Sequence, residues 1–329
     1  MRILVTGGAG FIGSNFVRML LADTEDTGTG AGTGTGAVTE VVVLDKLTYA
    51  GDRANLPAGD PRLTFVHGDI ADRPLLRKLL PGCGAVVHFA AESHVDRSLG
   101  GPEAFVATNV AGTAALFDAC LEAGTERVVH ISTDEVYGSV PEGASTESDP
   151  LLPNSPYAAS KAAADLLARA YHRSYGLPVL VTRCTNNYGP RQYPEKLVPL
   201  FVTRLLSGRD VPLYGDGRNI RQWVHVDDHC RAVRLVLERG VPGEIYNVGG
   251  GTGLTNRELT DRLLELCGAD GGRVRYVADR AAHDLRYAVD DSKITEQLGY
   301  RPRVDFSDGL AEVVEWYRAH PHRWEGPSG

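Results

Sequence analysis

Short apolar runs alternate with longer amphipathic stretches along the first half of the chain. Runs rich in β-branched residues are typical of buried strands, and the stretches between them have apolar residues at helical spacing. This alternation predicts an α/β fold built on a doubly wound parallel sheet. The predicted strands cover residues 2–6, 40–44, 63–67, 85–89, 127–131 and 179–182.

The alternation becomes looser after residue 183. We expect residues 1–183 to form the first domain, with residues 222–250 returning to its sheet. Residues 184–221 and 251–329 are expected to form a smaller C-terminal lobe. The other predicted elements are helices at 108–123, 157–175, 226–238, 256–266 and 306–317, a strand at 244–248, loops at 186–190 and 194–197, and a turn at 212–217.

A glycine-rich turn follows the first predicted strand. Arg2–Thr6 runs directly into a turn with Gly7, Gly10 and Gly13, and a helix then ends near Ala22. The glycines allow a tight turn, close backbone approach to a pyrophosphate, and close packing of helix on strand. The N-terminus of the helix would then face the phosphates. This context predicts a dinucleotide-binding Rossmann domain.

Asp45 follows the second predicted strand and could bind the ribose of the dinucleotide. A ribose-binding acid ordinarily lies about 20 residues beyond the glycine turn, whereas Asp45 lies 32 residues beyond Gly13. Residues 27–36 are a Thr/Gly repeat, which accounts for the excess. Such a segment cannot bury enough apolar area to offset its ordering entropy, so we interpret it as a flexible insert. An acid at the ribose repels a 2′-phosphate and favours NAD over NADP, a preference that Lys46 slightly weakens.

Candidate acid–base residues follow the fifth predicted strand. Thr133, Asp134 and Glu135 stand at the carboxyl edge of the sheet, where ligands bind in parallel sheets. Paired carboxylates can act as general acid and base, although adjacent Asp and Glu also form solvated turns. Tyr157 and Lys161 share one face of the next helix. The lysine is expected to lower the pKa of the phenol, which could then deprotonate an alcohol during hydride transfer.

Other polar residues have two interpretations each. Asp69, after the third predicted strand, could reach the adenine or cap a helix. Arg218 and Arg221, beside aromatic residues, could clamp a diphosphate or form a solvated basic loop. Ser93, after the fourth predicted strand, could hydrogen-bond a substrate.

Composition limits the cell compartment and the classes of binding partner that we expect. The chain has 329 residues, 43% hydrophobic and 23% charged, which is ordinary for a soluble globular protein. Its net charge of −8 argues against a nucleic-acid-binding surface. We find no signal peptide and no apolar run that approaches the roughly 20 residues of a membrane span. Five scattered cysteines without a CxxC pair are typical of a reducing compartment and argue against a metal site. We therefore expect a cytoplasmic protein.

Several motifs together resemble one known family. The Thr6–Gly13 turn with Tyr157 and Lys161 is similar to the extended short-chain dehydrogenase/reductases. Within this family, the chain resembles the dTDP-glucose 4,6-dehydratase branch in four stretches, Ala90–Ser98, Ser132–Gly138, Asn186–Pro190 and Pro194–Leu197. The resemblance covers nearly the whole chain apart from the Thr/Gly repeat. Its most specific element is the Thr-Asp-Glu sequence, because related epimerases lack the carboxylate pair.

The resemblance implies bound NAD, a dTDP-sugar substrate, and a homodimer formed by the helices near 108–123 and 157–175. One departure is the sequence from Asp279 to Asp284, where the family often has Pro-Gly and this chain has Ala-Ala. Predicted cofactor positions are Gly7, Gly10, Phe11, Ile12, Gly13, Asp45, Lys46, Leu47, Thr48, Asp69, Ile70, Phe89, Ala90, Ala91, Ser93, Thr108, Tyr157, Lys161 and Asn187. Predicted substrate positions are Ser93, Thr133, Asn186, Lys196, Leu197, Pro212, Tyr214, Arg221, Asn256, Asp279, Arg280 and His283.

The resemblance also implies a reaction that converts dTDP-glucose to dTDP-4-keto-6-deoxyglucose in deoxysugar biosynthesis. Tyr157 with Lys161 would remove the C4 hydroxyl proton as NAD takes the hydride. Glu135 would remove the C5 proton while Asp134 protonates the departing C6 hydroxyl, and the hydride would return to C6. The alternatives are a nucleotide-sugar 4-epimerase, which needs no carboxylate pair, and a non-catalytic NAD-binding sensor, which needs none of these residues.

Overall fold

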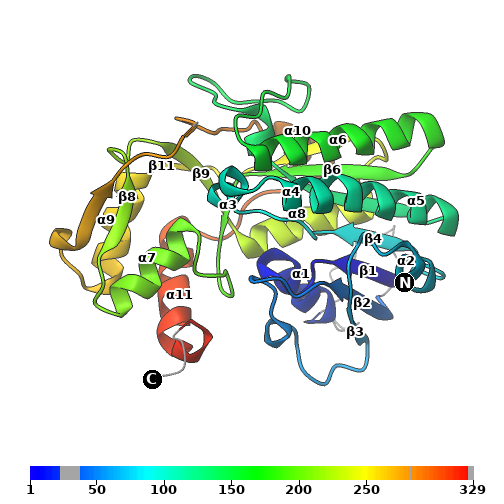
Figure 1. The fold of residues 1–329 in the computed structure, drawn as a ribbon, viewed down its shortest axis with the longest axis horizontal. Coiled ribbons are helices and arrows are strands. Elements are labelled where there is room, and N and C mark those ends of the chain that lie inside the picture. Colours follow the sequence, from blue (N-terminus) through cyan, green and yellow to red (C-terminus); the bar gives the residue numbers. More distant parts are fainter. Residues whose placement is uncertain (23–37, 282, 325–329) are drawn as a thin grey trace.

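A parallel sheet of seven strands forms the centre of the protein, with the order β10-β6-β5-β4-β1-β2-β3 (Figure 1). The computed structural model describes residues 1–22, 38–281 and 283–324, so the predicted insert at 27–36 lies outside the described residues. All neighbouring strands of this sheet are parallel, which confirms the predicted fold class. The strands are β1 Arg2–Thr6, β2 Glu40–Asp45, β3 Leu63–His67, β4 Ala85–His88, β5 Arg127–Thr133, β6 Val179–Cys184 and β10 Ile245–Val248.

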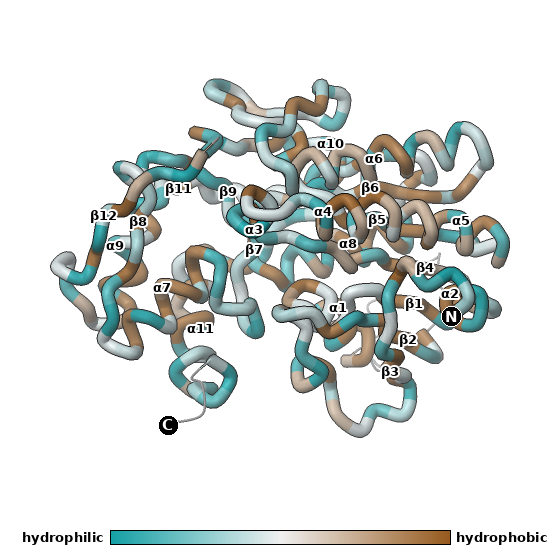
Figure 2. Tube along the Cα trace, in the orientation of Figure 1, coloured by the Kyte–Doolittle hydropathy of each residue, from teal (hydrophilic) through white to brown (hydrophobic). Residues whose placement is uncertain are grey.

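Helices cover both faces of this sheet, as the apolar strands require. Many of the apolar segments in Figure 2 lie on these strands and on the helices packed against them. One face packs against α1 Phe11–Ala22, α8 Val226–Arg239 and α10 Ser292–Leu298, and the other against α2 Arg73–Leu79, α5 Thr113–Ala123 and α6 Pro156–Tyr175.

A smaller lobe with its own hydrophobic core lies beside the seven-stranded sheet (Figure 1). It contains a three-stranded sheet, β11-β9-β7, and a parallel pair of β12 with β8. Its elements are β7 Asn186–Tyr188, α7 Leu197–Leu206, β8 Val211–Tyr214, β9 Ile220–His225, β11 Thr252–Thr255, α9 Asn256–Cys267, β12 Val274–Val277 and α11 Phe306–Ala319. Short helical segments elsewhere are η1 Arg53–Asn55, α3 Val95–Gly100, η3 Asp134–Tyr137, η4 Gly271–Arg273 and η5 Pro321–Arg323.

Helix α6 has a complete cap at its start. The Ser155 side chain accepts a hydrogen bond from the backbone N–H of Ala158, and Pro156 occupies the first helical position. Gly176, with a left-handed φ of 71°, ends the helix. Because this cap fixes the start of α6, it also fixes the positions of the residues in its first two turns.

Several segments differ from the predictions. Asn186–Tyr188 and Val211–Tyr214 are strands, not a loop and a turn, because each pairs with a strand distant in the sequence. The turn is confined to residues 215–217. Ile294 and Tyr300, expected in the smaller lobe, pack into the core of the seven-stranded sheet.

The predicted helix at 108–123 begins earlier than expected. The helical segments α4 Glu103–Phe105, η2 Val106–Gly112 and α5 form one stretch, Glu103–Ala123, and η2 is a π-helix. By length and composition this stretch could cross a membrane, and 50% of its 18-residue apolar window is buried inside the protein. The expectation that no apolar run approaches the length of a membrane span was therefore wrong for this helix. A core helix of a soluble protein can have the same length, composition and partial burial.

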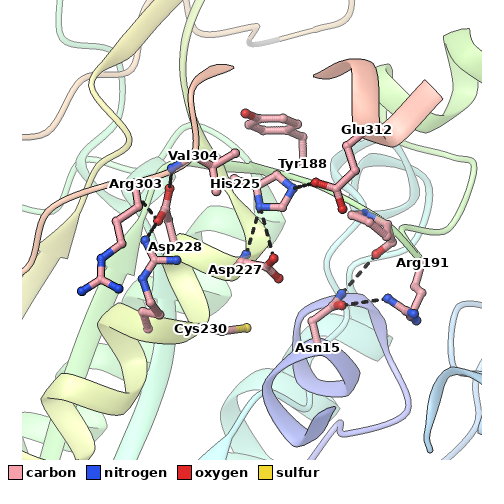
Figure 3. A network of polar contacts seen from close by, with 12 residues as sticks. Asn15, Tyr188, Arg191, His225, Asp227, Asp228, Cys230, Arg303, Val304 and Glu312 are labelled. Atoms are coloured by element: carbon pink, nitrogen blue, oxygen red, sulfur yellow. Dashed lines mark hydrogen bonds and ion pairs between the residues drawn. The ribbon is translucent and has the colours of Figure 1, made fainter. Parts of the chain in front are cut away.

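A polar network joins α8 to the segment before α11 (Figure 3). The carboxylate of Asp228 accepts hydrogen bonds from the backbone N–H groups of Arg303 and Val304, at 2.9 and 3.0 Å. The buried His225 has its Nε2 3.9 Å from a carboxylate oxygen of Glu312 on α11. The Asp228 contacts tie α8, which packs on the central sheet, to the segment before α11, whereas the His225–Glu312 contact links β9 to α11 within the smaller lobe.

Candidate active site

A cavity of about 430 Å³ lies between the carboxyl edge of the seven-stranded sheet and the smaller lobe. Its walls combine the ends of β1, β2, β4, β5 and β6 with residues of α7, β8 and β9. Ligands of open parallel sheets bind at this edge. We refer below to its cofactor end, around the glycine turn and Asp45, and its sugar end, around Glu135 and Arg221.

The glycine turn brings backbone close to backbone at the cofactor end. A Cβ atom on Gly7 would lie 2.5 Å from the backbone nitrogen of Ala90, and one on Gly13 would lie 2.3 Å from the carbonyl oxygen of Gly7. Gly7 also has a left-handed φ of 69°. Side chains at these positions would force the turn open, so the turn fits the pyrophosphate of a dinucleotide.

Asp45 lines the cavity at the end of β2. Its carboxylate accepts hydrogen bonds from the backbone N–H groups of Ala9 and Leu47, at 2.9 and 2.8 Å. Each carboxylate oxygen keeps a further lone pair for a ribose hydroxyl. Asp45 therefore both holds the glycine turn and offers acceptors to a ligand.

Asp69 is held in an ion pair and does not cap a helix. Its carboxylate lies 2.7 Å from the ammonium of Lys46, and α2 is capped by Asp72. The interpretation of Asp69 as a helix cap was wrong. Asp69 and Lys46 both line the cofactor end of the cavity.

The three residues that end β5 and begin η3 are packed together. The Thr133 hydroxyl donates to Asp134 Oδ1 at 3.2 Å and accepts from the backbone N–H of Glu135 at 3.3 Å. Thr133 and Glu135 line the cavity, whereas Asp134, 3% exposed, does not. This arrangement excludes the solvated turn as an explanation of the carboxylate pair.

The two carboxyl groups have different electrostatic surroundings. Burial and the neighbouring Glu135 raise the pKa of Asp134 to about 8, so Asp134 holds a proton at neutral pH. Burial also raises the pKa of Glu135, against the opposing positive charges of Lys196, Arg221 and Arg280. An acid–base pair needs such a difference between its members.

Tyr157 and Lys161 both line the cavity from the start of α6. Lys161 Nζ donates to the carbonyl oxygen of Ile131 at 2.6 Å, and burial lowers the pKa of Lys161 to about 8. Burial and then the charge of Glu135 raise the pKa of Tyr157 well above its ordinary value. The prediction of a lowered pKa for Tyr157 is therefore wrong for the protein without ligands, because burial and a carboxylate outweigh the lysine.

The structure distinguishes the two arginines of the predicted clamp. Arg218 is exposed and pairs with Asp216. Arg218 is therefore a solvated residue of the loop and not part of a clamp. Arg221 is buried, donates to the carbonyl oxygen of Asp284 at 2.9 Å, and has its guanidinium carbon 4.2 Å from the ring centroid of Tyr287. A buried guanidinium in the cavity wall can receive a phosphate group.

Other cations and amides complete the sugar end. Lys196 Nζ donates to the carbonyl oxygen of Ser93 at 2.6 Å, and Arg280 lies 3.2 Å from a carboxylate oxygen of Asp96. The buried Oδ1 of Asn186 has no hydrogen-bond partner among the described residues. Polar atoms left unpaired in a cavity wall are suited to contacts with a ligand.

Nearly all the predicted site residues line this cavity. Leu47, Asp134 and Asp279 do not. The predicted residues that do are Gly7, Gly10, Phe11, Ile12, Gly13, Asp45, Lys46, Thr48, Asp69, Ile70, Phe89, Ala90, Ala91, Ser93, Thr108, Thr133, Glu135, Tyr157, Lys161, Asn186, Asn187, Lys196, Leu197, Pro212, Tyr214, Arg221, Asn256, Arg280 and His283.

Some residues of the cavity region were missed in the sequence. Tyr49 donates to a carboxylate oxygen of Glu195 at 3.0 Å, and Arg97 lies 3.4 Å from the same carboxylate. The Arg97 guanidinium carbon also lies 3.6 Å from the ring centroid of Tyr49. The only signal was the motif that contains Glu195, because its partners belong to distant segments. Tyr287 was also missed, although it lies three residues after the Asp284 of a recognised motif.

A family model described as GDP-mannose 4,6 dehydratase matches residues 4–313. The chain belongs to this family. A dTDP-glucose 4,6-dehydratase from Actinoplanes sp. is 57% identical to this member over 326 residues, covering 98% of this chain and 100% of the relative. The resemblance found in the motifs is thereby confirmed.

Solved structures show the same fold in this family member and in related enzymes. The dTDP-glucose 4,6-dehydratase DesIV from Streptomyces venezuelae, solved with NAD and TYD (dTDP) bound, is 62% identical, with a TM-score of 0.95 and 99% of each chain covered. A UDP-glucose 4-epimerase from Thermotoga maritima is 33% identical, with a TM-score of 0.86, covering 98% of this chain and 100% of the epimerase. Since both activities occur on one fold, the residues of the site must distinguish them.

Proposed function

We propose that the protein is an NAD-dependent dTDP-glucose 4,6-dehydratase, a hydro-lyase that forms dTDP-4-keto-6-deoxyglucose. The observation that carries this proposal is the Asp134–Glu135 pair, with Asp134 buried and Glu135 half-buried in the wall of the cavity that Tyr157 and Lys161 also line. An epimerase needs the tyrosine but has no use for a second proton donor and acceptor. The dTDP-glucose 4,6-dehydratases that the chain resembles support the same activity.

The cofactor end fits NAD, and each group there has a task. The glycine turn would receive the pyrophosphate, and Asp45 the ribose hydroxyls. Bound NAD would supply a hydride acceptor for C4 of the sugar, return the hydride to C6, and favour the phenolate of Tyr157 by the positive charge of its oxidised ring. Lys161, held by the carbonyl oxygen of Ile131, would stabilise that phenolate.

Tyr157 and the carboxylate pair would handle the protons. Tyr157 takes the proton of the C4 hydroxyl as C4 becomes a ketone. Glu135 then removes the C5 proton, made acidic by that ketone, while Asp134 gives its proton to the C6 hydroxyl, which leaves as water. Because Asp134 does not line the cavity, its proton would pass through the Thr133 hydroxyl, which contacts Asp134 Oδ1.

The last step restores the starting charges. C5 recovers a proton from Glu135 as the hydride reaches C6. The proton gained by Tyr157 replaces the one lost by Asp134, so the residues end each turnover as they began. The raised pKa of Asp134 is consistent with a resting proton donor.

The sugar end would hold the dTDP group and the hexose. Arg221 and Arg280 would face the diphosphate, since planar guanidinium groups bind phosphate oxygens in pairs. Lys196 and Asn186 would contact the sugar, since both lie in the cavity wall and the charge of Lys196 acts on Glu135. We also propose a cytoplasmic location, because five scattered cysteines without a CxxC pair are typical of a reducing compartment.

The test is incubation with dTDP-glucose carrying deuterium at C4. We expect the alkali-induced absorbance of a 4-keto sugar, with the label at C6 of the product and no net use of NAD. In heavy water, solvent deuterium should enter at C5. Return of the label to C4 would indicate an epimerase. The absence of any turnover, with NAD still bound, would indicate the sensor.

A homodimer is the proposed assembly, formed by the Glu103–Ala123 stretch and α6. Val106 and Leu166, one on each segment, are exposed apolar side chains, each with 55% of its surface accessible. Apolar surface of this kind on adjacent helices is suited to an interface between copies. Light scattering at micromolar concentration should give twice the monomer mass, and Leu166→Glu should reduce it. A monomeric mass for the unmodified protein would contradict the proposal.

A further inference from the structure

A second cavity, of about 290 Å³, adjoins the first on the side of α11. The two cavities share Ala50, Gly51, Gln192 and Tyr193 in their walls. The proposed reaction uses none of the residues that line the second cavity alone. Its size is near the lower end of the range for small-molecule pockets, about 300–1,000 Å³.

Arginine side chains converge on this cavity from separate parts of the chain. Arg323, after α11, donates to the Asn55 side chain and lies 3.1 Å from a carboxylate oxygen of Asp52. Arg18, on α1, donates from Nε to the backbone carbonyl of the same Asn55 at 2.7 Å. Asn55 therefore holds two guanidinium groups near each other.

Arg191 brings a third guanidinium to the same place. It lines the cavity and donates to Asn15 Oδ1 at 3.2 Å, one helical turn before Arg18 on α1 (Figure 3). Its guanidinium carbon lies 5.8 Å from the ring centroid of Trp316, another lining residue. Burial, then the charges of Arg18 and Arg323, lower the pKa of Arg191.

Negative charge near these arginines is sparse. Among residues 1–22, 38–281 and 283–324, neither Arg18 nor Arg191 has a carboxylate within ion-pair distance, and Asp52 pairs with Arg323 alone. Asp227 and Glu312 act on Arg191 more weakly than the two arginines do. The cavity is thus cationic.

We propose that the second cavity binds a small phosphate-bearing anion, held by Arg191 and Arg323 in its wall, with Arg18 adding positive charge from behind Asn55. Guanidinium groups present paired N–H donors that match the oxygens of a phosphate, and a bound anion would offset the repulsion among three like charges. Because Gln192 and Tyr193 belong to both walls, an anion here would contact the same loop that lines the main cavity. The proposal is independent of the reaction proposed above.

The experiment is calorimetric titration of the purified protein, with NAD and dTDP present at saturating concentration, using inorganic pyrophosphate and dTMP as separate probes. Filling the main cavity first ensures that an anion binding there is not counted. We expect one site with millimolar or tighter affinity, corresponding to about −4 kcal/mol or more. Tighter binding of dTMP would identify a nucleotide as the preferred ligand, and equal binding would identify the phosphate group alone.

Variants locate the site. Arg323→Gln should weaken binding about tenfold or more, since it removes a charge-assisted contact. Arg18→Gln, made separately, should weaken binding less, since it removes a neighbouring positive charge. Arg323→Lys should retain part of the affinity. Arg239→Gln, a change of an exposed arginine at the end of α8, should bind as the unmodified protein does. The melting temperature of each variant shows whether it is folded. If Arg323→Gln does not fold, Arg18→Gln still tests the site.

Three results would overturn the proposal. The first is no binding of either probe up to about 10 mM, since a Kd above that range would be too weak for a built site. The second is binding that appears only without NAD and dTDP, which would place the anion in the main cavity. The third is equal affinity in the Arg18, Arg323 and Arg239 glutamine variants. Failure of turnover with dTDP-glucose would overturn the proposed reaction and leave this titration unaffected.

Discussion

The two ends of the main cavity are built in different ways. The cofactor end is built on backbone from the glycine turn and the end of β2, with the side chains of Asp45, Lys46 and Asp69 beside it. The sugar end is made of charged side chains from segments near residues 93, 135, 196, 221 and 280. A change at the cofactor end should therefore alter affinity, whereas a change at the sugar end should alter chemistry. The predictions below test that division.

Glu135→Gln should have the largest effect. The amide cannot take the C5 proton, so turnover should fall by about 10²–10⁴-fold, the usual contribution of a general base. Oxidation at C4 should survive, visible as reduced cofactor in a single-turnover absorbance measurement. Glu126→Gln, at an exposed position, is the matched control and should be unchanged. Near-normal turnover of the Glu135 variant would assign the base to another residue.

The protonation of Asp134 should make both turnover and folding stability depend on pH. The amide variant should lose turnover but keep its stability as pH rises. Turnover should fall as pH rises through about 8, because Asp134 must carry a proton to donate it. Its pKa in the folded protein lies above the ordinary 3.8, so the folded state loses stability as pH rises from near 4 to near 8. Asp134→Asn cannot ionise and should avoid this loss.

The measurement is the melting temperature of Asp134→Asn and of the unmodified protein between pH 5 and pH 8. We expect the variant to be nearly inactive, yet increasingly the more stable of the two as pH rises. A difference that does not change with pH would show that Asp134 keeps an ordinary pKa. Glu126→Gln serves again as the control, because an exposed carboxylate should produce no such trend.

What the sequence predicts well depends on how local each feature is. The apolar strands of the central sheet and the glycine turn are determined by residues adjacent in the sequence, and both were predicted. The strands β7 and β8 were missed because their partners, β9 and β12, lie far along the chain. The pKa of Tyr157 was predicted in the wrong direction for a similar reason. Its spacing from Lys161 was visible in the sequence, but its burial and its proximity to Glu135 arise only on folding.

Asp45→Ala should have a smaller effect, confined to the cofactor. It removes the acceptor for the ribose hydroxyls and also the repulsion of a 2′-phosphate. The affinity for NAD should therefore fall by about tenfold, and the affinity for NADP should fall less. Some loss will be common to both cofactors, since Asp45 also holds the backbone of Ala9 and Leu47. Titration of both cofactors into Asp45→Asn, which keeps the side-chain shape, separates the two contributions. Equal losses for NAD and NADP would remove Asp45 from the ribose.

Deletion of residues 27–36 should have the smallest effect of all. The segment lies outside the described residues, and its Thr/Gly composition predicts that it adds little to the folded state. The deletion leaves residues 23–26 and 37–39 between α1 and β2, close to the usual length of such a connection. Because loop entropy varies slowly with length, the melting temperature should move by no more than about 2 °C. Turnover and the amount of NAD bound after purification should stay the same. A large loss of bound NAD would show that the insert belongs to the cofactor end, and that this end is not built from the turn and strand alone.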